Sequence, residues 1–558
     1  MKKLCCSWLL ITFSWTIPAQ AAQPPAAAIA SAHPLATRAG HEILSAGGNA
    51  FDAAIAVTAT LAVVEPTGSG LGGGGFWLLH RARDGFETMI DGRERAPLAA
   101  SRDMYLDQHG QVIPGRSIDG PLAAGIPGEV AAMVYLARHY GRLPLNRSLA
   151  PAIAIARKGF VIDEHYRRLA AFRLNALKKS PAATAIFLHQ QAVPNAGFIL
   201  QQPALARTLE AIAKDGKAGF YGGRVARQLV AGVRQSGGLW TLADLEQYRV
   251  QERSPIQGKY HGMRITAAAP PSSGGIALMT MLNILSGYPL AKFDATHRHH
   301  LIIEAMRRAY RDRAEYLGDP DFVRIPVAQL IHPYYAAGLR NSIRRDRATP
   351  SSELPGFNPP AEGRHTTHFS ILDREGNRVA ATLSVNYPFG SAFVAAGTGV
   401  LLNDEMDDFS AKPGTPNVYG LVGARSNAIA PGKRPLSSMT PTFAENDRGV
   451  AILGTPGGSR IITMVLLAVL DFAEGKGPAS WVSLKRYHHQ YLPDVVSYEP
   501  GTFPAAEIAA LQQLGHRLQA RRRPYGNMQA VFWDRRNNRV TAASDPRGSG
   551  LALVKAGR

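Results

Sequence analysis

One short stretch, 363–370, constrains the fold and chemistry of this chain more than any other. It reads Gly-Arg-His-Thr-Thr-His-Phe-Ser and opens a run that alternates like a β-strand. If the peptide bond before Thr366 is cut, that residue gains a free α-amine beside its hydroxyl, so one amino acid holds both base and nucleophile. Such an amine titrates at about 7.7 to 8.0, which suits a proton acceptor near neutral pH. The stretch predicts a self-processing amidase, although Thr-Thr-His before a strand is also a common string of strand formers.

The residues that follow predict a β-hairpin. A segment with turn chemistry, 374–377, separates the first run from a second strand-like run, 378–386. The hairpin would begin with Thr366 and return with Ser384 and Asn386. We therefore expect these two polar side chains to come back toward the nucleophile.

Three further segments supply the remaining parts of an acyl-transfer site. Clustered carboxylates lie within 402–409, and paired hydroxyls lie at Ser437 and Ser438. Gly457 and Gly458 join a short apolar strand to a long apolar helix-like segment. Backbone N–H groups exposed by two glycines at a helix entrance can stabilise an oxyanion.

These segments, in this order, resemble the γ-glutamyltransferases, also called glutathione hydrolases, of the N-terminal-nucleophile hydrolase superfamily. The resemblance extends from residues 47–54 to residues 543–547 and so covers nearly the whole chain. A length of 558 residues alone would predict three or four domains. The resemblance instead implies one α+β unit with four layers in the order αββα, built from two fragments of one precursor.

The resemblance also implies catalytic roles. The precursor would cut itself between His365 and Thr366, and Thr366 would then attack the substrate carbonyl to form a γ-glutamyl ester. Ser384 stands where many relatives have a threonine whose hydroxyl hydrogen-bonds the nucleophile. Gly457 and Gly458 would form the oxyanion hole.

Six residues are implied to bind the glutamyl group: Arg93, Asn386, Glu405, Asp408, Ser437 and Ser438. The amide and the two carboxylates match residues that hold the α-ammonium group. Arg93 matches the arginine that pairs with the α-carboxylate, to which the serines add hydrogen bonds. This division is chemically sensible, because a guanidinium fork fits a carboxylate and carboxylates attract an ammonium. Taken singly, Arg93 also fits a surface ion pair with Glu94, and Asp407-Asp408 fits a solvated turn.

The segment 411–423 is rich in turn formers and holds one aromatic residue, Tyr419. It resembles a lid loop found in part of the family, in which Tyr419 would cover the bound glutamyl group. A lid excludes bulk water and helps to choose between hydrolysis and transfer. An ordinary surface loop is the alternative.

The start of the chain has the three regions of a secretory signal peptide, with cleavage expected after Ala21. Both cysteines, Cys5 and Cys6, would leave with it. We therefore expect a periplasmic or secreted protein with a signal peptide at 1–21, a large subunit at 22–365 and a small catalytic subunit at 366–558. The two subunits would form a heterodimer.

The net charge of +20 is the strongest argument for a different function. Arginines cluster at 307–313, 340–345 and 517–523. No nucleic-acid motif accompanies them, so we expect a solvated basic face that attracts anionic substrates such as glutathione, and no nucleic-acid partner. No apolar run after the signal segment is long enough to span a bilayer, since 461–470 fits a buried helix better.

Two tempting motifs are set aside. The glycines at 68–73 formally fit a dinucleotide fingerprint, but a helix is expected before them and a strand after them, which is the reverse of the required order. Helical spacing places His300 and Glu304 on one face, but two ligands do not make a metal site. The expected chemistry needs no cofactor and no metal.

Two alternatives stay open at this point. A glutaryl-cephalosporin-type acylase of the same superfamily would handle an acyl group without the α-ammonium, against which Asn386, Glu405 and Asp408 argue. A basic envelope-binding protein with an idle site is the alternative from another class. The sequence also leaves open the acceptor, the balance of hydrolysis and transfer, and any assembly beyond one heterodimer.

Overall fold

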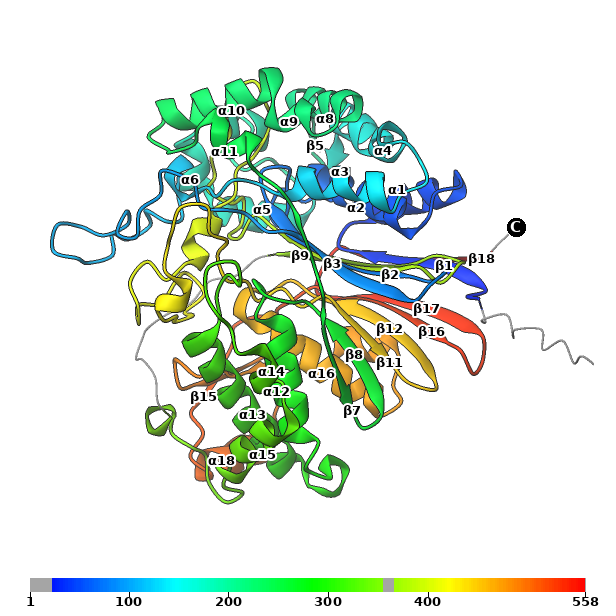
Figure 1. The fold of residues 1–558 in the computed structure, drawn as a ribbon, viewed down its shortest axis with the longest axis vertical. Coiled ribbons are helices and arrows are strands. Elements are labelled where there is room, and N and C mark those ends of the chain that lie inside the picture. Colours follow the sequence, from blue (N-terminus) through cyan, green and yellow to red (C-terminus); the bar gives the residue numbers. More distant parts are fainter. Residues whose placement is uncertain (1–22, 355–365, 557–558) are drawn as a thin grey trace, which may run out of the picture.

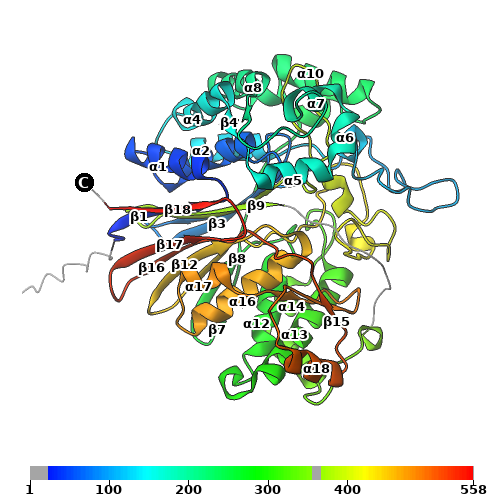
Figure 2. The ribbon, with the colours of Figure 1, turned by 180° about the vertical axis from the view of Figure 1, so that it is seen from behind.

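The structure, a computed structural model, describes residues 23–354 and 366–556. The expected signal peptide, His365 and most of the approach to the cut lie outside the described residues. The remainder forms four layers in the order helix, sheet, sheet and helix (Figure 1). The reverse view shows the same stacking, with the two sheets face to face between the helical layers (Figure 2). The expected αββα arrangement is confirmed.

The first sheet has seven strands in the order β18-β1-β9-β10-β2-β3-β6. In that order their bounds are Leu551–Ala556, Ala26–Ser31, Thr367–Leu372, Arg378–Ser384, Gly74–Arg81, Phe86–Gly92 and Gln251–Arg253. The second sheet has six strands in the order β17-β16-β12-β11-β8-β7. Their bounds are Arg539–Ser544, Gln529–Asp534, Gly449–Gly454, Thr442–Glu445, Met263–Ala267 and Ile256–Tyr260. Two small sheets contain β13 (Tyr487–His488), β14 (Val496–Tyr498) and β15 (Leu518–Ala520), and β4 (Phe160–Val161) and β5 (Ile199–Leu200).

The helices over the first sheet come from the first half of the chain (Figure 1). They are α1 (Pro34–Ser45), α2 (Ala50–Val64), α3 (Glu129–His139), α4 (Leu145–Lys158), α5 (Glu164–Phe172), α6 (Leu174–Lys178), α7 (Pro181–Phe187), α8 (Pro203–Asp215), α9 (Ala218–Tyr221), α10 (Gly223–Gln235) and α11 (Leu242–Glu246). The helices on the side of the second sheet are α12 (Gly274–Leu285), α13 (Ala295–Tyr316), α14 (Val327–Leu330), α15 (Pro333–Asn341), α16 (Ile461–Ala473), α17 (Pro478–Ser483) and α18 (Ala505–Gln513). Short 3-10 turns lie at Pro121–Ala123, Leu290–Lys292, Ser351–Glu353, Glu405–Asp408, Arg425–Asn427 and Gly458–Arg460.

The expected hairpin is confirmed as β9 and β10, which pair in an antiparallel register. Its turn is held by the carboxylate of Asp373, whose Oδ1 accepts hydrogen bonds from the backbone N–H groups of Glu375 and Asn377, each at 2.9 Å. Along β10, Val379 packs toward the helices and Ala380 toward the second sheet. This period of two lets one central hairpin serve both hydrophobic layers.

Helix α2 leads from the outer layer to the centre of the molecule. It starts at a capping box, in which Asn49 Oδ1 accepts from the N–H of Asp52 (3.1 Å) and Asp52 Oδ2 accepts from the N–H of Asn49 (3.0 Å). All 15 of its residues are buried, as expected of a helix that is apolar on every side. The helix ends at Glu65, directly before the glycine-rich turn.

That turn packs backbone against backbone. A Cβ atom on Gly72 would lie 2.1 Å from the carbonyl oxygen of Leu401, and one on Gly73 would lie 2.1 Å from that of Ser384. Only glycine permits such an approach. Because α2 precedes the turn and β2 follows it, the dinucleotide reading is excluded.

One prediction about charge is wrong. Arg307, Arg308 and Arg313 of α13 do not form a solvated face, since they are only 2%, 1% and 4% exposed. Nε of Arg307 and Nη1 of Arg308 donate to the two oxygens of Glu304, at 3.1 and 2.6 Å. Buried arginines persist where a carboxylate or carbonyl groups hold them. Ser351 is also buried and accepts a hydrogen bond from Arg307 at 2.6 Å.

Among the residues that the structure describes, none of the helices combines the length and the apolar character needed to cross a bilayer. In the other two arginine clusters, Arg344, Arg345 and Arg517 are exposed. The predicted basic surface is therefore smaller than the sequence indicated.

We expect Glu304→Gln to lower the free energy of unfolding by about 3 to 5 kcal/mol at neutral pH, because buried Arg308 loses its carboxylate partner and buried Arg307 keeps only Asp494. Burial alone would raise the pKa of Glu304, but the neighbouring guanidinium groups lower it to about 2. The stabilisation is therefore complete above the ordinary value of 4.5 and is lost as the pH falls toward about 2. Urea unfolding measures the change, with the exposed Glu42→Gln as control. A loss no larger than that of the control would contradict the expectation.

Candidate active site

Thr366 stands directly before β9 and lies between two pockets. The arginine pocket, of about 280 Å³, is lined by Thr366 together with Arg93, Ser384, Asn386, Asp408, Ser437 and Ser438. The Glu65 pocket, of about 630 Å³, is lined by Thr366 together with Glu65, His165, Arg168, Gly457 and Asn527. Thr366 itself is 8% exposed. A nucleophile placed between two pockets can receive an acyl group from one side and lose a leaving group toward the other.

Strand register places the site residues in one row across the first sheet. Leu383 pairs with Thr367, so the next residue, Ser384, is set opposite Thr366. Ser384 in turn pairs with Gly74 of β2. Gly75 pairs with Gly92 of β3, so the register carries the row on to Arg93. The hairpin thus fixes the nucleophile, the second hydroxyl and the arginine together.

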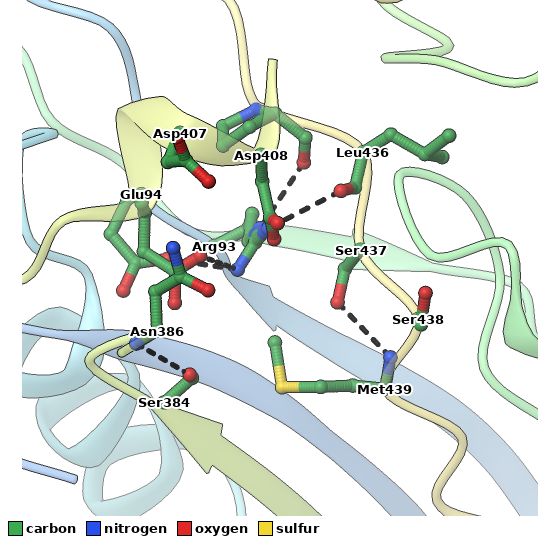
Figure 3. A network of polar contacts seen from close by, with 12 residues as sticks. Arg93, Glu94, Ser384, Asn386, Asp407, Asp408, Leu436, Ser437, Ser438 and Met439 are labelled. Atoms are coloured by element: carbon green, nitrogen blue, oxygen red, sulfur yellow. Dashed lines mark hydrogen bonds and ion pairs between the residues drawn. The ribbon is translucent and has the colours of Figure 1, made fainter. Parts of the chain in front are cut away.

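Ser384 and Asn386 form a tight bend at the end of β10. The backbone N–H of Asn386 donates to Ser384 Oγ at 2.7 Å (Figure 3). Asn386 has a φ of +74°, a conformation that costs free energy and is concentrated at functional sites. Its side-chain amide donates to the carbonyl oxygen of Asp404 at 3.0 Å. The Ser384 hydroxyl also forms a side-chain hydrogen bond with Glu405, so it links this bend to the carboxyl groups of the pocket.

Arg93 lies at the centre of a buried charge cluster (Figure 3). Its guanidinium donates from Nη1 to Glu405 Oε2 at 2.6 Å and from Nη2 to Asp408 Oδ2 at 2.5 Å. Nε donates to the carbonyl oxygen of Pro435 at 3.1 Å. The side chain is only 1% exposed, so the alternative of a surface ion pair is wrong, although Glu94 does lie 3.6 Å away. The structure therefore joins the residues expected to hold the carboxylate and the ammonium into one network.

Burial raises the pKa of two carboxyl groups around Arg93. Burial raises the pKa of Glu94 well above its ordinary value, and repulsion from Glu405 adds to the effect. Burial also raises the pKa of Glu405 to about 8, against the attraction of Arg93. A ligand that carries one carboxylate and one ammonium on the same carbon adds no net charge to this cluster. Its carboxylate can pair with Arg93 while its ammonium pairs with the carboxyl groups around Arg93.

Asp407 points away from the pocket and holds the next loop. Its Oδ1 accepts from the hydroxyl of Ser117 at 2.6 Å, and its Oδ2 accepts from the N–H of Val418 at 2.8 Å. Burial raises its pKa to about 7. The alternative of a solvated turn at Asp407-Asp408 is therefore wrong, because the turn is built into the site.

The loop 411–423 places Tyr419 over the arginine pocket. The Tyr419 side chain is buried, and its hydroxyl donates to the carbonyl oxygen of Asn386 at 2.8 Å. A Cβ atom on Gly458 would lie 2.5 Å from the Tyr419 ring, so the ring packs directly on the glycine pair. The ring thus closes part of the pocket wall.

Gly457 and Gly458 stand at the N-terminal end of α16, which follows through a 3-10 turn. Their φ angles are +148° and +57°, so both positions favour glycine. Gly457 lines the Glu65 pocket and Gly458 lines the arginine pocket, while Thr366 lines both. The pair therefore faces the nucleophile from a helix start, where backbone N–H groups are free of helical partners.

Ser437 and Ser438 complete the wall opposite the hairpin. Ser437 Oγ accepts from the N–H of Met439 at 3.1 Å (Figure 3). The turn at 270–275 supports this wall. Both the N–H and the hydroxyl of Ser273 donate to the carbonyl oxygen of Ser437, at 2.8 and 2.7 Å.

Sequence reasoning missed Glu65. Its Oε2 accepts from the hydroxyl of Thr367 at 2.5 Å, and burial raises its pKa to about 7. One signal was available in the sequence. A carboxylate at the C-terminal end of an apolar helix interacts unfavourably with the helix dipole, which indicates that it has another role. Arg313 was noted but was assigned to the surface.

The structure brings together Arg93, Thr366, Ser384, Asn386, Asp408, Tyr419, Ser437, Ser438 and Gly458 in one pocket. Glu405 is connected to this pocket by its hydrogen bond with Arg93. Gly457 lines the neighbouring Glu65 pocket, which Thr366 also lines. Within the described ranges, no group of three or more metal-ligating side chains is present. His300, considered as a ligand, instead forms a hydrogen bond with His516 at 2.8 Å.

Known proteins resemble this chain along nearly its full length. The family described as γ-glutamyltranspeptidase matches residues 36–554. The glutathione hydrolase proenzyme of Pseudomonas sp. strain A14 is 43% identical over 539 residues, which covers 94% of this chain and 93% of that protein. The glutathione hydrolase proenzyme of Escherichia coli K12 is 42% identical over 525 residues, which covers 93% and 90%.

A solved structure shares the fold. The cephalosporin acylase from Bacillus halodurans superimposes with a TM-score of 0.83 at 27% identity, covering 98% of this chain and 99% of that one. The family match, the proenzyme relatives and this fold agree with the resemblance read from the sequence. The chain therefore belongs to the γ-glutamyltranspeptidase family, as a self-processing γ-glutamyl-transferring enzyme of the N-terminal-nucleophile type.

Proposed function

We propose that this enzyme cleaves the γ-glutamyl amide of glutathione and related compounds, and passes the γ-glutamyl group to water or to an amino acid or peptide. The observation that carries the proposal is the position of Thr366 between the arginine pocket and the Glu65 pocket. The arginine pocket offers a guanidinium, carboxylates and hydroxyls suited to the α-carboxylate and α-ammonium of a glutamyl group. The Glu65 pocket takes the departing amine.

Maturation is proposed to cut the chain between His365 and Thr366. The fragments 22–365 and 366–558 then form a heterodimer, after loss of the signal peptide 1–21 and export to the periplasm or the medium. Strand order supports a stable assembly, because β9 and β10 of the second fragment lie between β1 and β2 of the first. The two fragments therefore share the hydrogen bonds of one sheet and need no covalent link.

The reaction follows from this geometry. As Thr366 Oγ attacks the γ-carbonyl carbon, the α-amine of the same residue takes the hydroxyl proton. The N–H groups of Gly457 and Gly458 stabilise the oxyanion of the tetrahedral intermediate. The amine then gives the proton to the leaving nitrogen as the C–N bond breaks, which leaves a γ-glutamyl ester on Thr366. Water or an acceptor amine attacks the ester by the same steps and restores the hydroxyl.

The ligand roles follow from charge. We propose that Arg93, Ser437 and Ser438 bind the α-carboxylate. In the same assignment, Glu405, Asp408 and Asn386 bind the α-ammonium. Tyr419 covers the bound group. The reaction uses no cofactor and no metal.

A second candidate activity is that of a glutaryl-cephalosporin acylase, which the likeness to the Bacillus halodurans enzyme favours. A glutaryl group lacks the ammonium and would leave Glu405 and Asp408 facing no positive charge on the ligand. The third alternative, a basic envelope-binding protein, rests on the exposed arginines alone. The buried charge cluster around Arg93 favours the glutamyl substrate over both.

We expect Thr366→Ala to leave the chain uncut and inactive, because the nucleophile of both reactions is removed. Thr366→Ser keeps a hydroxyl and should still cut and turn over, at a lower rate. A denaturing gel and hydrolysis of γ-glutamyl p-nitroanilide measure the two properties. An alanine variant that yields two fragments and hydrolyses the anilide would refute the assignment.

We expect Asp408→Asn to reduce kcat/KM for γ-glutamyl p-nitroanilide by about 10- to 150-fold, since a hydrogen bond to a charged group contributes about 1.5 to 3 kcal/mol. Activity on glutaryl p-nitroanilide, which has no ammonium, should fall much less. The exposed Asp103→Asn serves as control. Equal losses on both anilides would show that Asp408 does not hold the ammonium.

We expect Tyr419→Phe to increase hydrolysis relative to transfer, because the loss of its hydrogen bond to Asn386, about 1 kcal/mol, loosens the loop over the pocket. Rates of anilide cleavage with and without a dipeptide acceptor measure the ratio. Tyr334→Phe, at an 82% exposed tyrosine, is the matched control. An unchanged ratio would remove Tyr419 from this role.

A further inference from the structure

Arg313 is a buried cation that forms no ion pair with any residue the structure describes. It lies on α13 and is 4% exposed. Within the described parts of the chain, no ion pair joins it to a carboxylate, whereas Arg307 and Arg308 on the same helix both pair with Glu304. A buried charge without an ion-pair partner lowers the stability of the fold, so its presence beside a binding site indicates a functional role.

The guanidinium is held by hydroxyl groups alone among the described residues. Nε donates to Ser273 Oγ at 3.0 Å, and Nη2 donates to Ser438 Oγ at 3.2 Å. Ser273 in turn donates to the carbonyl oxygen of Ser437 from both its N–H and its hydroxyl. Arg313 therefore connects the 270–275 turn to the wall of the arginine pocket.

These contacts set the direction of the serine protons. Ser438 Oγ accepts from Arg313, so its own O–H must find another acceptor. Ser437 Oγ likewise accepts, from the N–H of Met439. Both serines line the arginine pocket. Two hydroxyls are thus prepared as donors toward an anion in that pocket, one of them polarised by a positive charge.

The surrounding charges fit the same picture. Burial lowers the pKa of Arg313, Asp408 attracts its charge and Arg93 repels it. Asp408 is already bound to Arg93. A carboxylate entering the pocket between the two arginines would supply the negative charge that Arg313 does not receive as an ion pair from any described residue.

We propose that Arg313 is a positioning residue for substrate recognition: it aims the Ser438 hydroxyl at the α-carboxylate of the glutamyl group and adds a second buried positive charge behind it. The inference rests on the proposed function and deepens it. It assigns a role to a buried arginine and to the 270–275 turn, neither of which touches the reacting atoms.

The test compares Arg313→Met and Arg313→Lys with the parent enzyme on two anilides. γ-Glutamyl p-nitroanilide carries the α-carboxylate, whereas 4-aminobutyryl p-nitroanilide keeps the amino group and lacks the carboxylate. We expect Arg313→Met to raise KM for the first by about 10- to 100-fold with little change in kcat, and to leave kcat/KM for the second within about twofold. The aminobutyryl compound is followed as a substrate or as a competitive inhibitor. Arg313→Lys should restore part of the loss.

Self-cleavage provides the folding control, because it requires an intact site around Thr366 but no substrate carboxylate. Arg298→Met, on the same helix and away from the pocket, is the matched variant. Equal losses on both anilides, a fall in kcat alone or no loss at all would overturn the role of Arg313. If Arg313→Met does not mature, the same comparison on Arg313→Lys decides, with a smaller selective rise in KM expected. A parent enzyme that matures but ignores γ-glutamyl anilide would instead refute the proposed function.

Discussion

The rest of the site depends on the antiparallel register of β9 and β10 in the middle of the seven-stranded sheet. That register sets Ser384 opposite Thr366 and continues through Gly74 to Arg93. Because each strand buries one face against the helices and the other against the second sheet, a slip of one residue would turn every side chain to the wrong layer. The nucleophile is therefore fixed by the hydrophobic pattern of the strands and not by the loops around it.

The same topology explains how the enzyme stays assembled after the chain is cut. Strands from both sides of the expected cut pair with each other in both sheets, so separation of the fragments would break ladder hydrogen bonds and expose two hydrophobic layers. The cut can then act locally. It converts Thr366 from an internal residue into one with its own base, while its surroundings keep their geometry.

Buried charge is the second organising feature. Arg93 is paired with the carboxyl groups of Glu405 and Asp408, whereas Arg313 has only hydroxyl partners among the described residues. One arginine is thus partly neutralised and the other is left for a ligand. This asymmetry suits a zwitterion, which brings a carboxylate to one side of the pocket and an ammonium to the other.

Local patterns predicted much of this. The hairpin and α2 followed from periodicity and turn residues, because such features are encoded by neighbours in sequence. The layered fold followed from the family resemblance. Burial of Arg313 and the contact of Glu65 with Thr367 did not follow, since they depend on segments that only the tertiary fold brings together. An arginine-rich helix reads as a surface helix unless its partners are known.

The most direct test of the central claim is mass spectrometry of the enzyme quenched during turnover of a γ-glutamyl substrate. The account predicts that the smaller fragment begins at Thr366 and that a part of it is heavier by one glutamyl group, carried on its first residue. A fragment that begins elsewhere, or an acyl group found on another residue, would contradict it.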